Sequence, residues 1–206
     1  QHLGLLDSDV AVRHLKMKVG RLQQHWMKNC VAVGLSQGFI EPLEATALHL
    51  VQETVEGFID AFEKGDFSDR NRAAFNKSIN DRFEAVRNYI VAHYRVNSRS
   101  DTDYWVENGR NENLSSSLRS VLETWVRGKN VSDELDRQDI DRYYPSISWN
   151  CLLAGYGLYP EQHQLKPGNA LANKYKLDEI QNFIRRCGLN FRSHREEIDR
   201  LVNSTR

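Results

Sequence analysis

The chain has 206 residues, a length that suits one domain or one and a half, and its 28 Lys and Arg residues balance 28 Asp and Glu residues. A neutral balance provides no general field that would attract nucleic acid or an anionic membrane, and no run of about 18 apolar residues predicts a membrane span. No signal peptide opens the chain, so we expect a cytoplasmic location. Cys30, Cys151 and Cys187 lie far apart, which argues against a disulfide framework or a zinc site. We expect these cysteines to be small core residues, and we expect no bound metal.

Two strand-like stretches come first. Residues 17–25 alternate weakly, and residues 30–34 form a compact apolar run of the kind found in buried strands. Residues 35–42 are predicted as a loop. A lone strand pair cannot bury both of its faces, so we expect these strands to complete a larger sheet and the chain, which starts at Gln1, to be a fragment.

Helical periodicity dominates the chain after residue 45. The first helix is predicted from about residue 45 to residue 64, and its apolar face comprises Leu48, Val51, Val55, Phe58 and Phe62. The second helix is predicted at residues 71–94, with Ser68 or Asp69 as its cap. Its apolar stripe comprises Phe75, Ile79, Phe83, Val86, Ile90 and Tyr94.

The later elements are shorter. Residues 97–113 are predicted as a loop anchored by Tyr104 and Trp105, and residues 131–142 as a charged, solvated stretch. Further helices are predicted at residues 114–126 and 146–154, and one or two helices at residues 177–202. The fold class is therefore mainly α with a few N-terminal strands.

Residues 29–47 contain the sharpest local pattern, N-C-V-A-V-G-L-S-Q-G-F-I-E-P-L-E-A-T-A. It predicts a strand, a glycine-containing loop and the start of a helix. Free N–H groups at a helix N-terminus favour anions, and Thr46 and Ala47 would supply two of them beside Glu44. The alternative is that Glu44 merely offsets the helix dipole and that Thr46 lies in an ordinary first turn.

This segment resembles the second flavin-contacting segment of the flavin-dependent tryptophan halogenases. Residues 88–94 (N-Y-I-V-A-H-Y), 99–105 (R-S-D-T-D-Y-W) and 148–155 (S-W-N-C-L-L-A-G) resemble later segments of the same family, in the same order. The resemblance implies the C-terminal part of an FAD-dependent, Rossmann-type halogenase fold. Residues 1–50 would be the end of the FAD-binding module, and residues 51–206 a helical substrate-binding domain.

The resemblance also implies a chemistry. In such enzymes reduced FAD (FADH2), oxygen and a halide, chloride or bromide, generate the oxidant that halogenates an electron-rich aromatic such as an indole. A partner flavin reductase supplies the FADH2, and a homodimer is compatible with the family. Glu44 takes the position of the catalytic glutamate, and Thr46 and Ala47 that of the halide site, with Ala47 replacing a common Gly. The implied flavin contacts are Gly34, Leu35, Ser36, Gly38, Phe39, Pro42 and Ala47.

Three residues fall where the family holds its aromatic substrate, namely Tyr143, Tyr144 and Ser148. The alternative is that the tyrosines, with Trp149, are core anchors. Residues 131–139 lack the Tyr pair with which tryptophan-specific members grip the amino-acid head, so another indole, a phenol or a larger substrate fits as well. Glu41 is a weaker catalytic candidate, and its other interpretation is a loop residue that accepts from backbone N–H groups.

Several family features are absent from the sequence. It contains no G-x-G-x-x-G, no W-x-W-x-I-P and no lysine in the family's catalytic context. We therefore expect this chain alone to be inactive. Two other functions stay open: a flavoprotein monooxygenase that does not halogenate, and a non-catalytic helical module that binds a partner.

Overall fold

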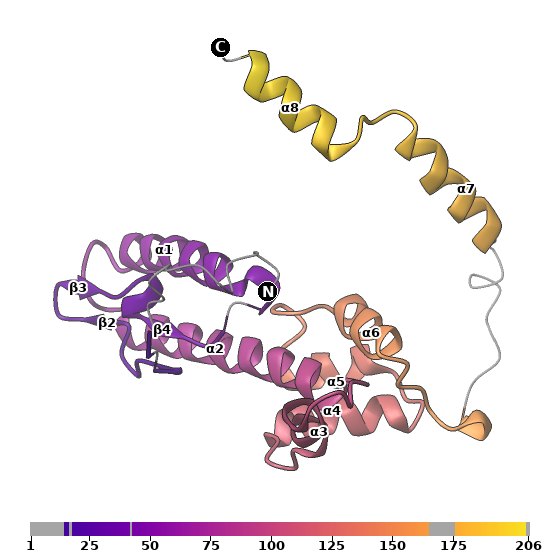
Figure 1. Cartoon of the computed structure of the whole chain (residues 1–206). Coiled ribbons are helices and arrows are strands. Elements are labelled where there is room, and N and C mark those ends of the chain that lie inside the picture. The colour runs from indigo at the N-terminus through magenta and orange to yellow at the C-terminus, as the bar shows by residue number, and fades with distance from the viewer. Residues whose placement is uncertain (1–14, 17, 42, 165–175, 205–206) are drawn as a thin grey trace. The chain divides into compact units, whose positions relative to one another are not determined.

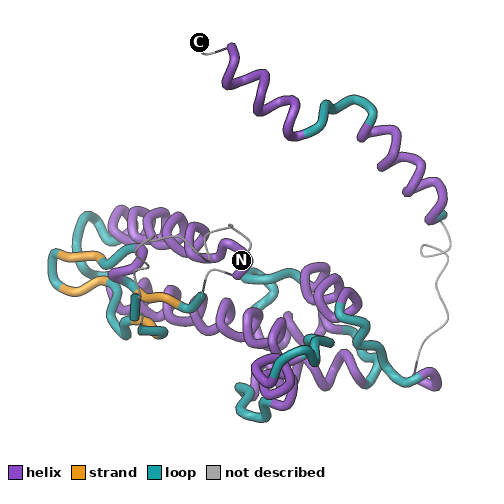
Figure 2. Tube along the Cα trace, viewed as in Figure 1, coloured by secondary structure: helices purple, strands orange, loops and turns teal. Residues whose placement is uncertain are grey.

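The computed structural model describes residues 15–16, 18–41, 43–164 and 176–204. The chain divides into two compact units, Gln1–Glu161 and Gln162–Arg206. Helices dominate both units, as the sequence predicts (Figures 1 and 2).

Two long antiparallel helices, α1 (Thr46–Lys64) and α2 (Arg72–Arg95), lie side by side in the first unit (Figure 1). Their predicted positions are confirmed to within one residue. The cap prediction is wrong, because Asn71 is the N-cap of α2 and makes no side-chain capping bond. Four shorter helices gather around the second half of α2: α3 (Asp103–Arg110), α4 (Ser116–Val126), α5 (Val131–Gln138) and α6 (Ser146–Gly155).

The strands are very short and lie beside the α1–α2 pair. They form two antiparallel pairs, β1 (Gly20–Arg21) with β4 (Gly38–Phe39) and β2 (Trp26–Met27) with β3 (Cys30–Val31). The predicted buried strand at residues 30–34 is therefore only two residues long. The chain leaves the extended conformation for a 3-10 turn, η1 (Gly34–Ser36), and Cys30 itself is exposed.

Two apolar clusters form the core, and α2 contributes to both of them. The first cluster packs the strands, α1 and the first part of α2 together. Its buried residues are Trp26, Leu50, Phe75, Ile79, Phe83, Val86 and Ile90. The other joins the second part of α2 to α4, α5 and α6 through Tyr89, Ala92, Leu118, Val121, Val131, Leu135, Trp149 and Leu152. Most of the predicted stripe on α2 is buried, as expected.

The apolar face predicted for α1 is partly wrong. Leu48 is 77% exposed and Val55 is also exposed, whereas Leu50 and Thr54 are buried. The buried line follows a spacing of four residues from Thr46 through Leu50 and Thr54. The apolar face of α1 is wider than the surface that α2 and η1 cover, so Leu48 and Val55 at its edge remain in solvent.

Three other expectations also fail. Residues 131–138 form the helix α5 rather than a solvated stretch, with Val131 and Leu135 buried against α4. The predicted loop at residues 97–113 contains α3, although Trp105 anchors it by stacking on Tyr94, as expected. Among the cysteines, Cys30 and Cys151 are exposed and Cys187 is half-buried, so none is a core residue.

Two asparagines of α2 hold the strand region in place. The side chain of Asn76 accepts from the backbone N–H groups of His25 and Trp26, each at 2.8 Å, and donates to the Trp26 carbonyl. Asn80 donates to the Gln23 carbonyl and lies 3.0 Å from the ring Nε2 of His25. Burial lowers the pKa of His25, whose ring also stacks on Phe83.

The second unit contains the 3-10 turn Gln162–Gln164 and the helices α7 (Leu177–Gly188) and α8 (His194–Ser204). The predicted interruption near Gly188 is confirmed. No helix in the described part of the chain is long and apolar enough to cross a membrane.

Candidate functional site

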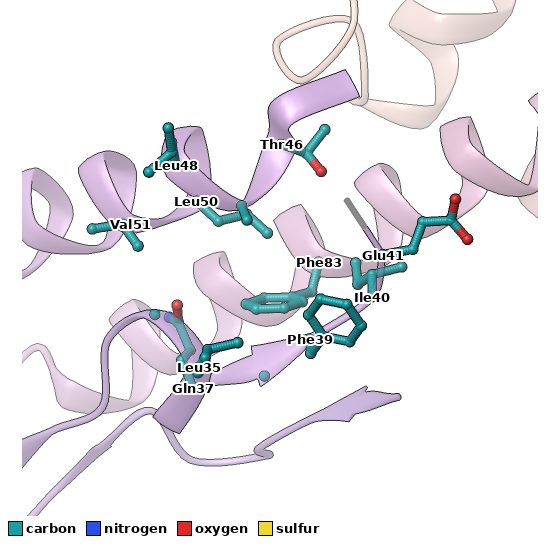
Figure 3. Close-up of a pocket in the computed structure, with 13 residues that line it drawn as sticks. Leu35, Gln37, Phe39, Ile40, Glu41, Thr46, Leu48, Leu50, Val51 and Phe83 are labelled. Atoms are coloured by element: carbon teal, nitrogen blue, oxygen red, sulfur yellow. The ribbon is translucent and has the colours of Figure 1, made fainter. Parts of the chain in front are cut away.

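A cavity of about 210 Å³ lies between α1 and the segment that carries η1 and β4 (Figure 3). Apolar side chains of Phe39, Ile40, Leu50 and Phe83 converge on it in Figure 3. The complete lining is Gly34, Leu35, Gln37, Gly38, Phe39, Ile40, Glu41, Thr46, Ala47, Leu48, Leu50, Val51 and Phe83. Nine of these thirteen residues lie in the segment 29–47 that the sequence singles out.

Most of the predicted flavin and halide residues meet at this cavity. The residues that line it are Gly34, Leu35, Gly38, Phe39, Thr46 and Ala47. Ser36 does not line it, and its hydroxyl instead bonds the backbone of Val33. Pro42 lies outside the described residues. The backbone of Glu44 belongs to the 3-10 turn Leu43–Ala45, directly before α1.

The local backbone structure favours glycine at both glycine positions of residues 29–47. Gly34 has a φ of +65°, a left-handed conformation that glycine adopts without the strain of a side chain. Gly38 lies against β1, where an added Cβ would sit 2.7 Å from the carbonyl oxygen of Gly20 and 2.8 Å from Cα of Arg21. Gly34 therefore allows the turn at η1, and Gly38 allows the close approach of β1 to β4.

Replacing Gly38 with Ala is expected to destabilise the fold by about 1–3 kcal/mol, because the new methyl group meets backbone atoms that cannot rotate away. Urea denaturation of the 206-residue chain measures this change in the free energy of unfolding. Gly57→Ala is the matched control, since its Cβ would only reach ordinary contact with Phe75 at 3.8 Å. Equal midpoints for the two variants would show that β1 gives way easily at Gly38.

The start of α1 has the geometry of an open helix N-terminus. Ala45, the N-cap, has a left-handed φ of 52°, and no acidic residue occupies the first turn. Thr46 is buried, and its hydroxyl donates to the Leu43 carbonyl at 3.3 Å. Ala47 stands in regular α-helix, so its methyl group strains nothing in the place of a glycine. The backbone N–H groups of this first turn are the groups that favour an anion.

A buried polar pair, which the sequence does not reveal, joins the cavity segment to α1. The side-chain amide of Gln37 donates to the hydroxyl of Thr54 at 2.8 Å, and that hydroxyl donates to the Leu50 carbonyl at 2.7 Å. Both side chains are almost fully buried. A single Gln between Ser36 and Gly38 provides no sequence signal, because its partner lies 17 positions away.

Glu41 also differs from its expected surroundings. Its carboxylate accepts a hydrogen bond from the hydroxyl of Tyr94, at the C-terminal end of α2, rather than from loop N–H groups. Burial, followed by this hydrogen bond, raises the pKa of Tyr94 above its ordinary value, so the phenol stays protonated as the donor. Glu41 therefore connects the cavity segment to α2.

The three predicted substrate residues do not line this cavity. They line three other hollows, one each. Tyr144 stacks on Tyr89 with ring centroids 3.9 Å apart and packs against both core clusters. The ring of Tyr143 has the guanidinium groups of Arg82 and Arg142 at 5.2 and 4.9 Å from its centroid.

Ser148 stands in the first turn of α6, where its carbonyl accepts from the hydroxyl of Tyr89 at 3.2 Å. Within the ranges that the structure describes, no group of three or more His, Cys, Asp or Glu side chains could hold a metal ion.

Comparison with known proteins relates this geometry to one family. A model of the tryptophan halogenases matches residues 3–170. The 7-chloro-L-tryptophan 6-halogenase of Kutzneria sp. (strain 744) is 32% identical over 160 residues, which are 76% of this chain and 30% of that protein. The tryptophan 6-halogenase of Streptomyces toxytricini is 33% identical over 168 residues, 80% of this chain and 30% of the relative.

Solved structures agree with these matches. The structure of the Streptomyces toxytricini enzyme superposes with a TM-score of 0.76 at 29% identity, over 96% of this chain and 40% of that one. A flavin-dependent halogenase from Brevundimonas sp. BAL3 superposes with a TM-score of 0.60 at 31% identity, over 84% of this chain and 33% of that one. The chain thus spans about a third of the length of the relatives it matches. The match of the family model over residues 3–170 shows that this chain belongs to the tryptophan halogenase family.

Proposed function

We propose that this chain supplies the C-terminal part of a flavin-dependent halogenase that acts on an electron-rich aromatic substrate, an indole or a tryptophan-like molecule. The observation that carries the proposal is the cavity lined by six of the predicted flavin and halide residues, namely Gly34, Leu35, Gly38, Phe39, Thr46 and Ala47. Its walls combine glycines without side chains with apolar groups, and the open start of α1 faces the same space.

The residues of the cavity suit part of a flavin. Gly34 and Gly38 contribute backbone to the wall of the cavity, and Leu35 and Phe39 offer apolar contact to a flat ring system. The cavity, at about 210 Å³, would hold only part of FAD, so other residues of the enzyme would hold the remainder. The proposed flavin contacts are Gly34, Leu35, Ser36, Gly38, Phe39, Pro42 and Ala47. Bound reduced FAD would donate electrons to oxygen, and the activated oxygen would oxidise the halide to the halogenating species.

The start of α1 would hold the halide. A chloride or bromide ion would accept from the backbone N–H groups of Thr46 and Ala47, where the positive end of the helix dipole favours negative charge. Glu44, one residue before the N-cap, would place its carboxylate near the halogenating species. Tyr143, Tyr144 and Ser148 are proposed as substrate contacts on the family resemblance alone.

The remaining proposals concern the whole protein. Residues 1–50 would belong to the FAD-binding module, residues 51–206 to the substrate-binding part, and a partner reductase would deliver FADH2. We place the enzyme in the cytoplasm, and a homodimer is its proposed assembly, which size-exclusion chromatography can measure.

The test uses the complete protein encoded by the reading frame that contains this chain. The purified protein is incubated with FAD, a flavin reductase, oxygen, chloride or bromide, and a panel of indoles and phenols. Mass spectrometry is expected to detect a product that has gained a halogen, only when halide is present. An oxygenated product that forms without halide would favour the monooxygenase alternative. A cooperatively folded protein that binds no FAD would favour the non-catalytic module.

A further inference from the structure

Glu41, which lies between β4 and α1, is tied to α2 by a hydrogen bond between side chains. The hydroxyl of Tyr94 donates to Oε1 of Glu41 across 53 positions of the sequence. Figure 3 shows the carboxylate of Glu41 turned away from the apolar side chains of Phe39 and Phe83. The carboxylate therefore points toward its partner on α2 while the rest of Glu41 lines the cavity.

Tyr94 is itself held firmly. Its ring stacks on Trp105, with ring centroids 5.7 Å apart and an angle of 14° between the planes. The guanidinium of Arg99 lies 4.5 Å from the centre of the Trp105 ring. The side-chain amide of Asn97 donates to the carbonyls of both Tyr94 and Trp105, at 2.5 and 3.3 Å. A stack with these contacts gives the phenol a defined position from which to donate.

A tyrosine and a glutamate are well suited to form this hydrogen bond. A phenol that is removed from water and donates to a carboxylate is held in its neutral form, and burial together with Glu41 raises the pKa of Tyr94. The phenol therefore keeps its proton and remains the donor of this hydrogen bond. Hydrogen bonds to charged groups are also stronger than those between neutral groups.

We propose that Tyr94 is a positioning residue that acts through Glu41 to hold the 3-10 turn Leu43–Ala45 and the start of α1 in place. The expected effect on catalysis rests on the proposed function, whereas the Tyr94–Glu41 hydrogen bond is present in this chain whatever its function. Residues 43–45 form a 3-10 turn that ends in the left-handed Ala45, a path that a free loop would sample only part of the time.

The first measurement is amide hydrogen exchange in the 206-residue chain. Tyr94→Phe removes the hydroxyl but retains the ring that stacks on Trp105. We expect exchange across residues 40–47 to become at least about tenfold faster, since one hydrogen bond to a charged group is lost. Tyr159→Phe is the matched control, because its exposed hydroxyl donates to the Ala154 carbonyl, outside the cavity. Exchange in Tyr94→Phe within twofold of this control would overturn the inference.

The second measurement uses the complete enzyme. Tyr94→Phe is expected to lower kcat for halogenation about tenfold and to leave KM for the aromatic substrate unchanged. Tyr159→Phe, the same control, should keep the wild-type kcat, because its hydroxyl bonds the Ala154 carbonyl outside the cavity. Wild-type kcat in Tyr94→Phe would overturn the inference. If the wild-type enzyme forms no halogenated product but Tyr94→Phe still speeds amide exchange, the positioning role of Tyr94 is supported and only the proposed function fails.

Discussion

Glu44→Gln is expected to lower the rate of halogenation by at least about a hundredfold, the loss that follows removal of a positioned acid or base in many enzymes. Glutamine retains the size of the side chain but can neither carry a negative charge nor accept a proton. Flavin affinity should change less than twofold, because the backbone around Gly34 and Gly38 is untouched. Product formation measured by chromatography and FAD titration measured by fluorescence quenching test the two expectations separately.

The control for Glu44→Gln is Glu56→Gln, which removes a carboxylate from the exposed side of α1. Its only hydrogen bond among the described side chains is accepted from Gln52, on the same helix, at 2.9 Å. We expect it to leave halogenation at the wild-type rate. Turnover of Glu44→Gln within twofold of this control would remove Glu44 from the mechanism. A joint loss of flavin binding and activity would assign it a structural role instead.

Trp26→Ala is expected to destabilise the chain by about 3–5 kcal/mol, the usual cost of removing a large aromatic side chain from a core. Trp26 is 3% exposed, and its ring meets the rings of Phe58, Phe62 and Phe75 edge to face at centroid distances of 4.9, 6.0 and 5.9 Å. Its indole N–H also donates to the Lys28 carbonyl. A loss of this size is a large fraction of the stability of a typical domain, about 5–15 kcal/mol.

Met27→Ala is the matched control for Trp26→Ala, because Met27 is the other residue of β2 and is 57% exposed. Its effect should stay within about 0.5 kcal/mol, as for most surface positions. Urea denaturation followed by circular dichroism measures both variants. A cost below about 1 kcal/mol for Trp26→Ala would mean that the strand region is not part of the cooperative core.

The resemblance predicted flavin and halide residues within residues 29–47, and six of them line the cavity. They are near neighbours in the sequence, so one turn and the start of one helix are enough to bring them to the same space. The buried Gln37–Thr54 pair and the Tyr94–Glu41 bond were not predicted. Both join residues 17 or more positions apart, for which a single sequence carries no pairing signal.

The sequence by itself determined where the two long helices begin and end and which side of α2 is apolar. These features depend on local causes, namely the spacing of apolar side chains and the Gly65 that follows Lys64. The tertiary structure alone decided which apolar residues are covered. Leu48 matches the helical period and yet lies in solvent, whereas Leu135 lies in a highly charged stretch and is completely buried. Burial depends on which neighbouring element packs against a face, and a local pattern of residues does not specify that neighbour.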